Sequence, residues 1–382
     1  YFKSTSRFNS MIRFFFCLSI FLFSFLLTHC AVHPPVADNN LPDEAIVYRL
    51  VEPLFNLNQT STVLRNKIGK EASQVVFEIE GVCMGCHAYS SQGHIAVNVK
   101  KKGDRRLVIF SSDSDGLHLF DTKKIGEFSF LAWSSDARHL AMAVNTFGVI
   151  DIKNDVLEPF DLRYQSGDIA IYDMTTKEIK LLPGASEMDF VEDMPAWSPD
   201  GKELLFVKYK SEKDAPIENM SIYRIPFNNG AGGTPAPVVI ASGSGDFNYF
   251  PTYSPNGKWI SFVKGEGSKG VFARKTSDIY LLPRTGGTPK RLSLNAEGVM
   301  DSWHRWSKDG RRMFFSSKRG GEMTALYAST VDADGTALQP VKVTGHDKVK
   351  VNIPEFAPGK HFQEDGTSVI RDTIDKIYNE GK

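Results

Sequence analysis

The sequence predicts an all-β protein: a β-propeller of about six four-stranded blades, with an N-terminal signal segment and a short C-terminal helix. Two observations carry this prediction. An aromatic residue, a tight turn and an apolar strand form a motif that recurs along the chain. Further strands follow each copy, and polar turns separate them. Recurrence of one unit along a chain is the sequence sign of a repeat architecture.

The recurrent motif has three strong copies and three weak ones. The strong copies read Trp-Ser-Pro-Asp-Gly, Tyr-Ser-Pro-Asn-Gly and Trp-Ser-Lys-Asp-Gly, and an apolar strand follows each. Proline presets φ at the turn, and the glycine after Asp or Asn supplies the positive φ that closes it. The six copies begin at Trp197, Tyr253, Trp306, Tyr89, Trp133 and Phe356.

The strands between these copies share an Ile-Tyr or Leu-Tyr pattern, at residues 168–172, 221–225, 278–282 and 325–327. One unit is therefore a meander of about four strands, which cannot bury both of its faces alone. Packing such units side by side in a ring hides those faces and protects the strand edges. Six copies favour six blades, and five or seven stay open because the terminal copies are weak.

We expect the chain to divide into five parts. The propeller is predicted over residues 81–365, after a tether and N-terminal segment over 31–80. Apolar residues at helical spacing, from Ile370 to Tyr378, predict a helical tail over 366–382. Met11 resembles a start residue, so residues 1–10 are expected to be an upstream extension and 11–30 a signal peptide.

The signal prediction depends on the run from Phe14 to Leu27, which contains only Phe, Leu, Ile, Cys and Ser and follows Arg13. Such a run is short for a bilayer span and suits the core of a secretory signal. The Leu-Thr-His-Cys segment that ends at Cys30 resembles a bacterial lipobox, although His29 stands where a small residue is expected. Lipidation of Cys30 and simple secretion both stay open.

The chemistry-bearing motif is Cys83-Met-Gly-Cys86-His87. Two thiols three positions apart can add to the two vinyl groups of one porphyrin, and the adjacent histidine then binds the iron. A redox dithiol or half of a zinc site are the alternatives. A zinc site would need a second pair of ligands, and no other Cys pair is present. We therefore predict haem c, with Cys83 and Cys86 as thioether links and His87 as proximal ligand.

The sixth iron position has a candidate from the repeat register. His87 lies three residues before Ser90, and His304 lies three residues before Ser307. Residues at one register of a propeller form a ring around its axis, so the hypothesis is bis-His ligation by His87 and His304. Packing of His304 beside neighbouring tryptophans is the alternative role. Met300 and Met194 are the substitute ligands, and the other repeats hold Leu131, Pro195, Pro251 and Pro354 at this register.

Residues 248–259, 301–307 and 352–356 look like the repeats of TolB-like β-propellers. With Cys83, Cys86 and His87, the chain resembles a bacterial subgroup that carries a Cys-x-x-Cys-His motif in its first repeat. The resemblance covers about residues 80–360. TolB itself has an additional N-terminal domain and no haem motif, so its role is not carried over.

Lys plus Arg equals Asp plus Glu at 45 each, so no global field favours nucleic acid or anionic lipid. The sequence holds neither a nucleophile elbow nor a phosphate-binding loop, and an enzyme is not expected.

The predicted function is electron transfer or redox sensing in the bacterial envelope, with a redox partner or an envelope protein as partner. The membrane would be met only through a lipid anchor at Cys30. A non-enzymatic interaction scaffold, with a structural haem or none, is the alternative, and the oligomeric state stays open.

Overall fold

The computed structural model describes twelve stretches of the chain: residues 45–51, 61–67, 74–79, 83–101, 104–110, 117–120, 127–152, 160–211, 217–267, 274–321, 323–344 and 350–357. The expected signal peptide with Cys30, and the expected helical tail over 366–382, lie outside the described residues. The described residues form strands joined by turns, with almost no helix, which confirms the all-β prediction. The helical element among them is a single 3₁₀ turn, η2 (Asn228–Gly230).

Three of the sheets are meanders in which each strand pairs with the next along the chain. The first comprises β4 (Cys83–Tyr89), β5 (Ile95–Lys101), β6 (Asp104–Phe110) and β7 (Leu117–Phe120). The second comprises β16 (Asp246–Tyr253), β17 (Trp259–Glu266), β18 (Asp278–Pro283) and β19 (Lys290–Arg291). The third comprises β20 (Asp301–Trp306), β21 (Arg312–Ser317), β22 (Ala325–Thr330) and β23 (Val341–Thr344).

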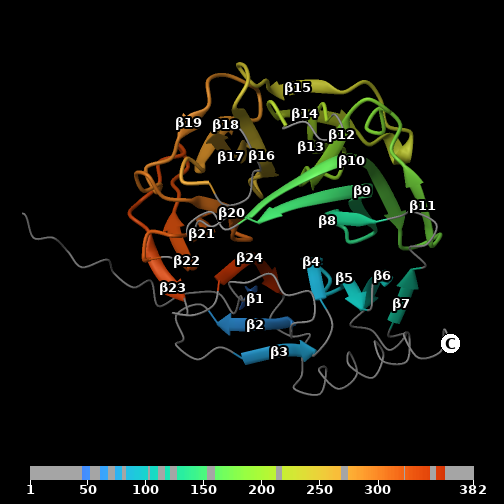
Figure 1. Cartoon of the computed structure of the whole chain (residues 1–382), viewed down its shortest axis with the longest axis horizontal. Coiled ribbons are helices and arrows are strands. Elements are labelled where there is room, and N and C mark those ends of the chain that lie inside the picture. The colour runs from blue at the N-terminus through green and yellow to red at the C-terminus, as the bar shows by residue number, and fades with distance from the viewer. Residues whose placement is uncertain are drawn as a thin grey trace, which may run out of the picture. The chain divides into compact units, whose positions relative to one another are not determined.

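An eight-stranded sheet consists of two further meanders, which one parallel pairing of Gly167 with Val191 joins. Its first half is β8 (Phe128–Trp133), β9 (His139–Ile152), β10 (Phe160–Asp173) and β11 (Glu178–Leu181). Its second half is β12 (Val191–Trp197), β13 (Glu203–Tyr209), β14 (Ser221–Pro226) and β15 (Ala236–Val239). Figure 1 shows the sheets following one another in chain order, with β4, β8, β12, β16 and β20 turned toward a shared centre.

The remaining sheet joins the two ends of the described chain. Its order is β24 (Lys350–Ala357), β1 (Ala45–Val51), β2 (Ser61–Lys67) and β3 (Gln74–Ile79). This differs from the expected boundary, which placed residues 31–80 outside the propeller. The last repeat supplies one strand, so the N-terminal strands supply the hydrogen-bonding partners that its edge needs, with Ala45 opposite Ala357.

The turns of the repeat have the predicted geometry. Gly201 and Gly257 have φ of 67°, and Gly310 has φ of 69°, a conformation that glycine adopts at low cost. A serine fixes each turn: the Ser198 hydroxyl donates to Asp200 at 2.7 Å and accepts from the backbone N–H of Glu203 at 3.1 Å. The same pair of bonds recurs at Ser134, Ser254 and Ser307.

The aromatic residue that opens the motif ties each sheet to the one before it. The Trp133 indole donates to the carbonyl of Ala88 in β4, and the Trp197 indole donates to the carbonyl of Ala132 in β8, both at 3.1 Å. Further on, Tyr253 donates to the Glu203 carboxylate at 2.8 Å, and Trp306 donates to the Ser261 hydroxyl at 2.8 Å. The motif is therefore an inter-sheet contact as well as a turn.

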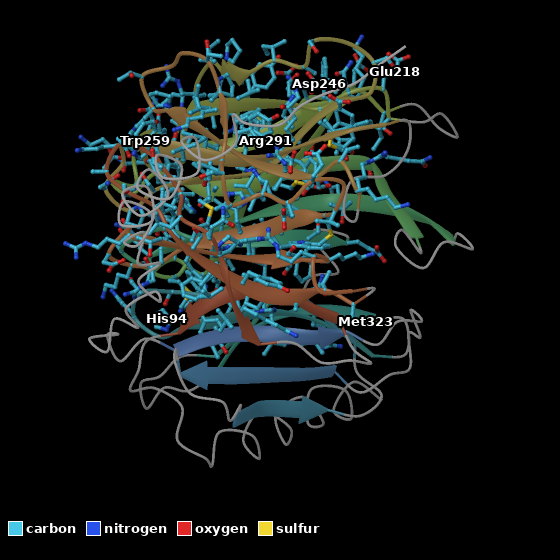
Figure 2. The ribbon with its side chains drawn as sticks, turned by 90° about the vertical axis from the view of Figure 1, so that its left-hand side faces the viewer. His94, Glu218, Asp246, Trp259, Arg291 and Met323 are labelled. Atoms are coloured by element: carbon cyan, nitrogen blue, oxygen red, sulfur yellow. The ribbon has the colours of Figure 1, made fainter. Side chains whose placement is uncertain are left out.

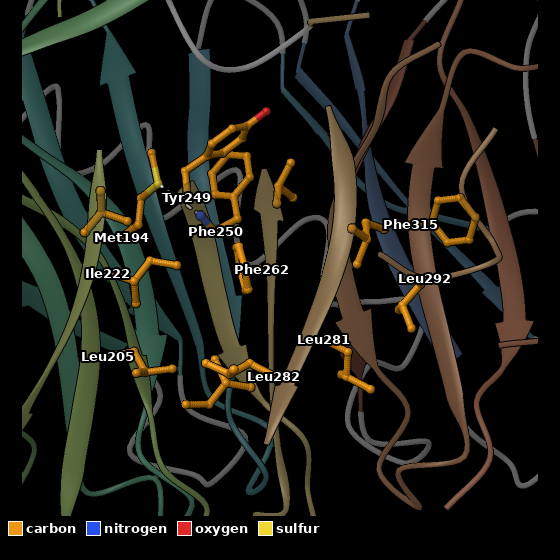
Figure 3. Close-up of a cluster of buried hydrophobic side chains, with 14 of the residues drawn as sticks. Met194, Leu205, Ile222, Tyr249, Phe250, Phe262, Leu281, Leu282, Leu292 and Phe315 are labelled. Carbon is orange, nitrogen blue, oxygen red and sulfur yellow. Dashed lines mark hydrogen bonds between the residues drawn. The ribbon is translucent and has the colours of Figure 1, made fainter. Parts of the chain in front are cut away.

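Buried apolar side chains form clusters that connect neighbouring sheets. Figure 2 draws the described side chains on the ribbon. The largest cluster draws residues from β12 through β22, and Figure 3 shows its centre. Phe262 of β17 is fully buried there and stacks on Tyr280 of β18 with ring centroids 5.8 Å apart. A side chain in such a place contributes both burial and close packing.

We expect Phe262→Ala to lower the free energy of unfolding by about 3–5 kcal/mol, because it removes buried apolar surface and leaves a cavity. Denaturant unfolding of the variant measures the loss. Leu338→Ala is the control, since Leu338 is 52% exposed and its replacement should change stability by less than about 0.5 kcal/mol. Equal effects of the two substitutions would contradict the assigned core.

Candidate functional site

A β-bulge interrupts the first strand of five meanders. In each, one extra residue breaks the register with the second strand, as it does between Asp193 and Ala196 of β12. The other bulges lie in β4 between Met84 and His87, and at matching places in β8, β16 and β20. A bulge re-aims the side chains beside it, so the same place in each sheet can present a residue inward.

The bulge residue takes a left-handed backbone conformation in four of these strands. The φ angles are 44° at Phe130, 54° at Met194, 49° at Phe250 and 44° at Trp303. None of them is glycine, and this conformation costs a non-glycine residue about 1–2 kcal/mol. Packing around the bulge must therefore hold these residues in place. Cys86 occupies the equivalent position in β4, one residue before His87.

These strands meet at one pocket, which we call the first-strand pocket. About 570 Å³ of empty space lies within it, including space open to solvent. It is lined by His87, Phe130, Leu131, Met194, Pro195, Phe250, Pro251, Trp303, Arg305 and Pro354. The register ring expected from the repeats is present here, since His87, Leu131, Pro195, Pro251 and Pro354 all belong to the lining.

Aromatic rings form much of the pocket wall. The Phe250 ring lies 5.8 Å from that of Phe130 and 5.7 Å from that of Trp303, measured between centroids. Beside them, the sulfur of Met194 accepts the backbone N–H of Phe250 at 3.5 Å, and Figure 3 shows these two side chains together. Arg305 is the one charged side chain among the described lining residues.

His87 lies in the wall of the first-strand pocket. Its side chain is 4% exposed, lines the first-strand pocket and meets the Tyr89 ring edge-on at 6.3 Å. The structure describes Cys83 and Cys86 through their backbone in β4, with Cys83 opposite Lys100. Cys86 directly precedes His87 at the β4 bulge.

His304 does not join His87 in the pocket. Its side chain is fully buried, and its Nε2 lies 2.9 Å from the Ser261 hydroxyl of β17. Trp306 donates to the same hydroxyl, so His304 belongs to an inter-sheet contact. Burial, aided by the charge of Arg305, lowers the pKa of His304 to about 3. The structure therefore favours the packing role for His304, and it does not bring together the bis-His pair of the hypothesis.

Of the two substitute ligands, the structure brings Met194 to the pocket and leaves Met300 away from it. Met300 is 1% exposed beside the start of β20, and its carbonyl accepts the backbone N–H of Lys318 at 3.1 Å. It is not among the residues that line the pocket. Met194 is 3% exposed within the lining, on β12.

The buried carboxyl of Asp193 contacts the backbone of Met194, which lines the pocket. Asp193 is fully buried, and its Oδ1 accepts the backbone N–H of Met194 at 2.8 Å. Burial raises the pKa of Asp193 to about 8, so this carboxyl is mainly neutral at pH 7. Asp193, Arg305 and the aromatic bulge residues were not predicted from the sequence. The signal that could have found the aromatic residues is their place immediately before the register of His87.

Among the stretches that the structure describes, no three His, Cys, Asp or Glu side chains gather as a metal cluster. A haem would not need such a cluster, because the porphyrin supplies four of the iron ligands. No helix in the described part of the chain is long and apolar enough to cross a membrane.

We expect the burial of neutral His304 to make stability fall in acid. Its pKa is about 3 in the folded protein and 6.5 in the unfolded chain, so between these values the unfolded chain binds a proton that the folded protein does not. Relative to His304→Gln, the wild type should lose up to about 1.4 kcal/mol of unfolding free energy per pH unit between pH 6 and 4.

Denaturant unfolding at several pH values measures this slope. His139→Gln is the matched control, because burial lowers the pKa of His139 while Asp173 opposes that effect, and a smaller change of slope should result. Parallel pH profiles for wild type and His304→Gln would show that His304 takes up a proton in the folded state, against the buried placement.

Known proteins resemble the chain mainly through its fold. No family model matches the sequence. The uncharacterized protein Atu1656 of Agrobacterium fabrum is 29% identical over 169 residues, which is 43% of this chain and 47% of that protein, so the match spans about half of the relative.

The crystal structure of TolB from Acinetobacter baumannii superposes with a TM-score of 0.54 at 17% identity, over 82% of this chain and 67% of that one. The structure of putative TolB from Agrobacterium tumefaciens, at 15% identity, covers 82% of this chain and 99% of that one with a TM-score of 0.48. The fold is therefore that of TolB-like β-propeller proteins.

Proposed function

We propose that this chain is an exported six-bladed β-propeller that carries a c-type haem at the first-strand pocket, bound through Cys83, Cys86 and His87. Its function would be electron transfer or redox sensing in the bacterial envelope. One observation supports this above the others: His87, from a Cys-x-x-Cys-His motif, lines a pocket whose other walls are mainly apolar and aromatic. That is the environment in which a porphyrin is held.

The composition of the pocket fits the group. Phenylalanine, tryptophan, leucine and proline side chains offer apolar surface to a flat macrocycle. Arg305 adds one cation at the wall, and a guanidinium pairs well with carboxylates such as the two propionates of haem. The residues present therefore fit a haem better than a bare metal ion.

Each part of the chain has a distinct task in this proposal. The β4 bulge holds His87 at the pocket directly after Cys86 in the chain, and the neighbouring aromatic rings form much of the pocket wall. An apolar wall strengthens an electrostatic interaction beside it, including one between Arg305 and an anionic group. Haem c, when bound, supplies one-electron chemistry at its iron.

A second candidate is a non-enzymatic scaffold for protein–protein interaction in the envelope, with a structural haem or none. Exposed apolar side chains favour it: Met188, before β12, is 98% exposed, and four other large apolar residues among those described are about half exposed. Single exposed residues are common on soluble proteins, so this observation is weaker than the pocket. The two candidates differ in whether the protein changes oxidation state reversibly.

Expression with a c-type haem maturation system should give a coloured protein with a sharp α-band on reduction. The colour should survive acid–acetone extraction, because thioether bonds hold the porphyrin. Cys83→Ser or Cys86→Ser should weaken the attachment and the double variant should abolish it, while Cys30→Ser, outside the motif, should retain the haem. A colourless wild type with two titratable thiols would remove the haem proposal and leave the scaffold.

Export is tested with the same full chain. We expect residues 11–30 to direct the protein out of the cytoplasm, as cell fractionation would measure. Wild type that sediments with membranes, with Cys30→Ser in the soluble periplasm, would identify Cys30 as a lipid anchor. Both proteins in the soluble periplasm would indicate simple secretion, and retention of both in the cytoplasm would contradict the proposal.

A further inference from the structure

We propose that Met194 is the second axial ligand of the haem iron and forms the axial pair with His87. This inference rests on the haem proposal above and names the missing ligand of that same site. Met194 takes the place that the sequence hypothesis gave to His304. It lies at the bulge of β12, in the second half of the eight-stranded sheet. Donor chemistry, the geometry of the bulge and the positions of the other candidates support Met194.

Donor chemistry leaves few choices. Among the described residues that line the first-strand pocket, His87 and Met194 carry the imidazole and thioether groups that bind haem iron. The remaining lining residues are aromatic or aliphatic side chains, three prolines and Arg305, whose guanidinium stays protonated. A protein donor for the sixth position is therefore Met194 if it comes from this lining.

The backbone holds Met194 at the pocket in one conformation. Its φ of 54° places it in the left-handed region, where the bulge turns the residue out of the strand. The Asp193 carboxyl accepts its N–H at 2.8 Å, and its sulfur accepts the N–H of Phe250 at 3.5 Å (Figure 3). A thioether sulfur has two lone pairs, so the second remains for a metal.

The repeat register places Met194 at the position equivalent to Cys86. Phe130, Phe250 and Trp303 hold that position in β8, β16 and β20, and all three line the same pocket. Sulfur therefore replaces an aromatic ring at two of the five bulges, once beside His87 and once in β12. Equivalent positions of a repeated blade lie at equal depth along the propeller axis, so the thioether and the attachment cysteine share one level.

The other candidates are occupied elsewhere. His304 contacts the Ser261 hydroxyl between two sheets, and Met300 is buried beside the start of β20, outside the lining. Moving either to the pocket would break buried packing. Met194 already lies in the pocket wall.

The experiment compares ligand substitutions at Met194 in the full chain, matured with its haem. Met194→Leu keeps the volume and removes the donor, so it should cost little stability while opening the sixth position. We expect the reduced variant to bind carbon monoxide, the oxidised variant to lose the sulfur-to-iron charge-transfer band, and the midpoint potential to fall, because a methionine ligand raises it. Met194→His should restore a six-coordinate spectrum with a lower potential than wild type.

Met300→Leu and His304→Gln are the controls, and both should keep the wild-type spectrum and potential. Unchanged spectra and no carbon monoxide binding in Met194→Leu would overturn the inference while the haem proposal stands, since the colour would remain. Carbon monoxide binding by the wild type would also overturn the inference and leave the haem proposal standing. If Met194→Leu fails to fold, a Met194→His variant with the wild-type potential would have the same meaning. A wild type without covalent haem overturns both proposals together.

Discussion

The architecture depends on the contact that each repeat makes with the sheet before it. A four-stranded meander has two apolar faces and cannot satisfy both alone, so it is stable only against neighbours. The aromatic residue of the motif provides the link: Trp133 and Trp197 reach back to backbone carbonyls of the preceding first strand. Because the indole is large and apolar with one donor, it fills the interface and satisfies a buried carbonyl at once.

This link also explains how the site is positioned. The contacts fix the first strands relative to one another, and a bulge just before each aromatic residue then projects a side chain into the space they enclose. Four of those residues adopt a left-handed backbone that a non-glycine side chain disfavours. Such strain persists where packing on both sides determines the conformation, and here the preceding and following sheets supply that packing. A rigid set of inward-facing positions results.

Local chemistry made much of the fold predictable. Asp-Gly and Asn-Gly pairs announced the turns at Gly201 and Gly257, and the spacing from each turn serine correctly placed His87 on a ring with Leu131 and Pro195. What escaped prediction depends on contacts distant in sequence. The pairing of Ala45 with Ala357 joins segments over three hundred residues apart, and no local pattern in residues 45–79 identifies that partner.

The site was predicted less evenly, for the same reason. His304 shares the register of His87, but its side chain contacts the buried hydroxyl of Ser261, 43 residues earlier, and does not line the pocket. Sequence register states where a backbone position lies and leaves open which way the side chain turns. The positive φ at Phe130 and Trp303 was equally hidden, because neither residue type prefers that conformation.

A fold shared at 17% identity with TolB cannot by itself assign an activity, since one propeller framework accommodates many functions. What distinguishes this chain is the set of residues placed at one repeated position. Cys86 and Met194 stand where three other repeats hold aromatic rings, and His87 stands where four others hold leucine or proline and one holds His304. A repeat protein can therefore acquire a cofactor site through a few substitutions at one register, because the backbone already points those positions at a common pocket and the unsubstituted repeats already provide its apolar wall.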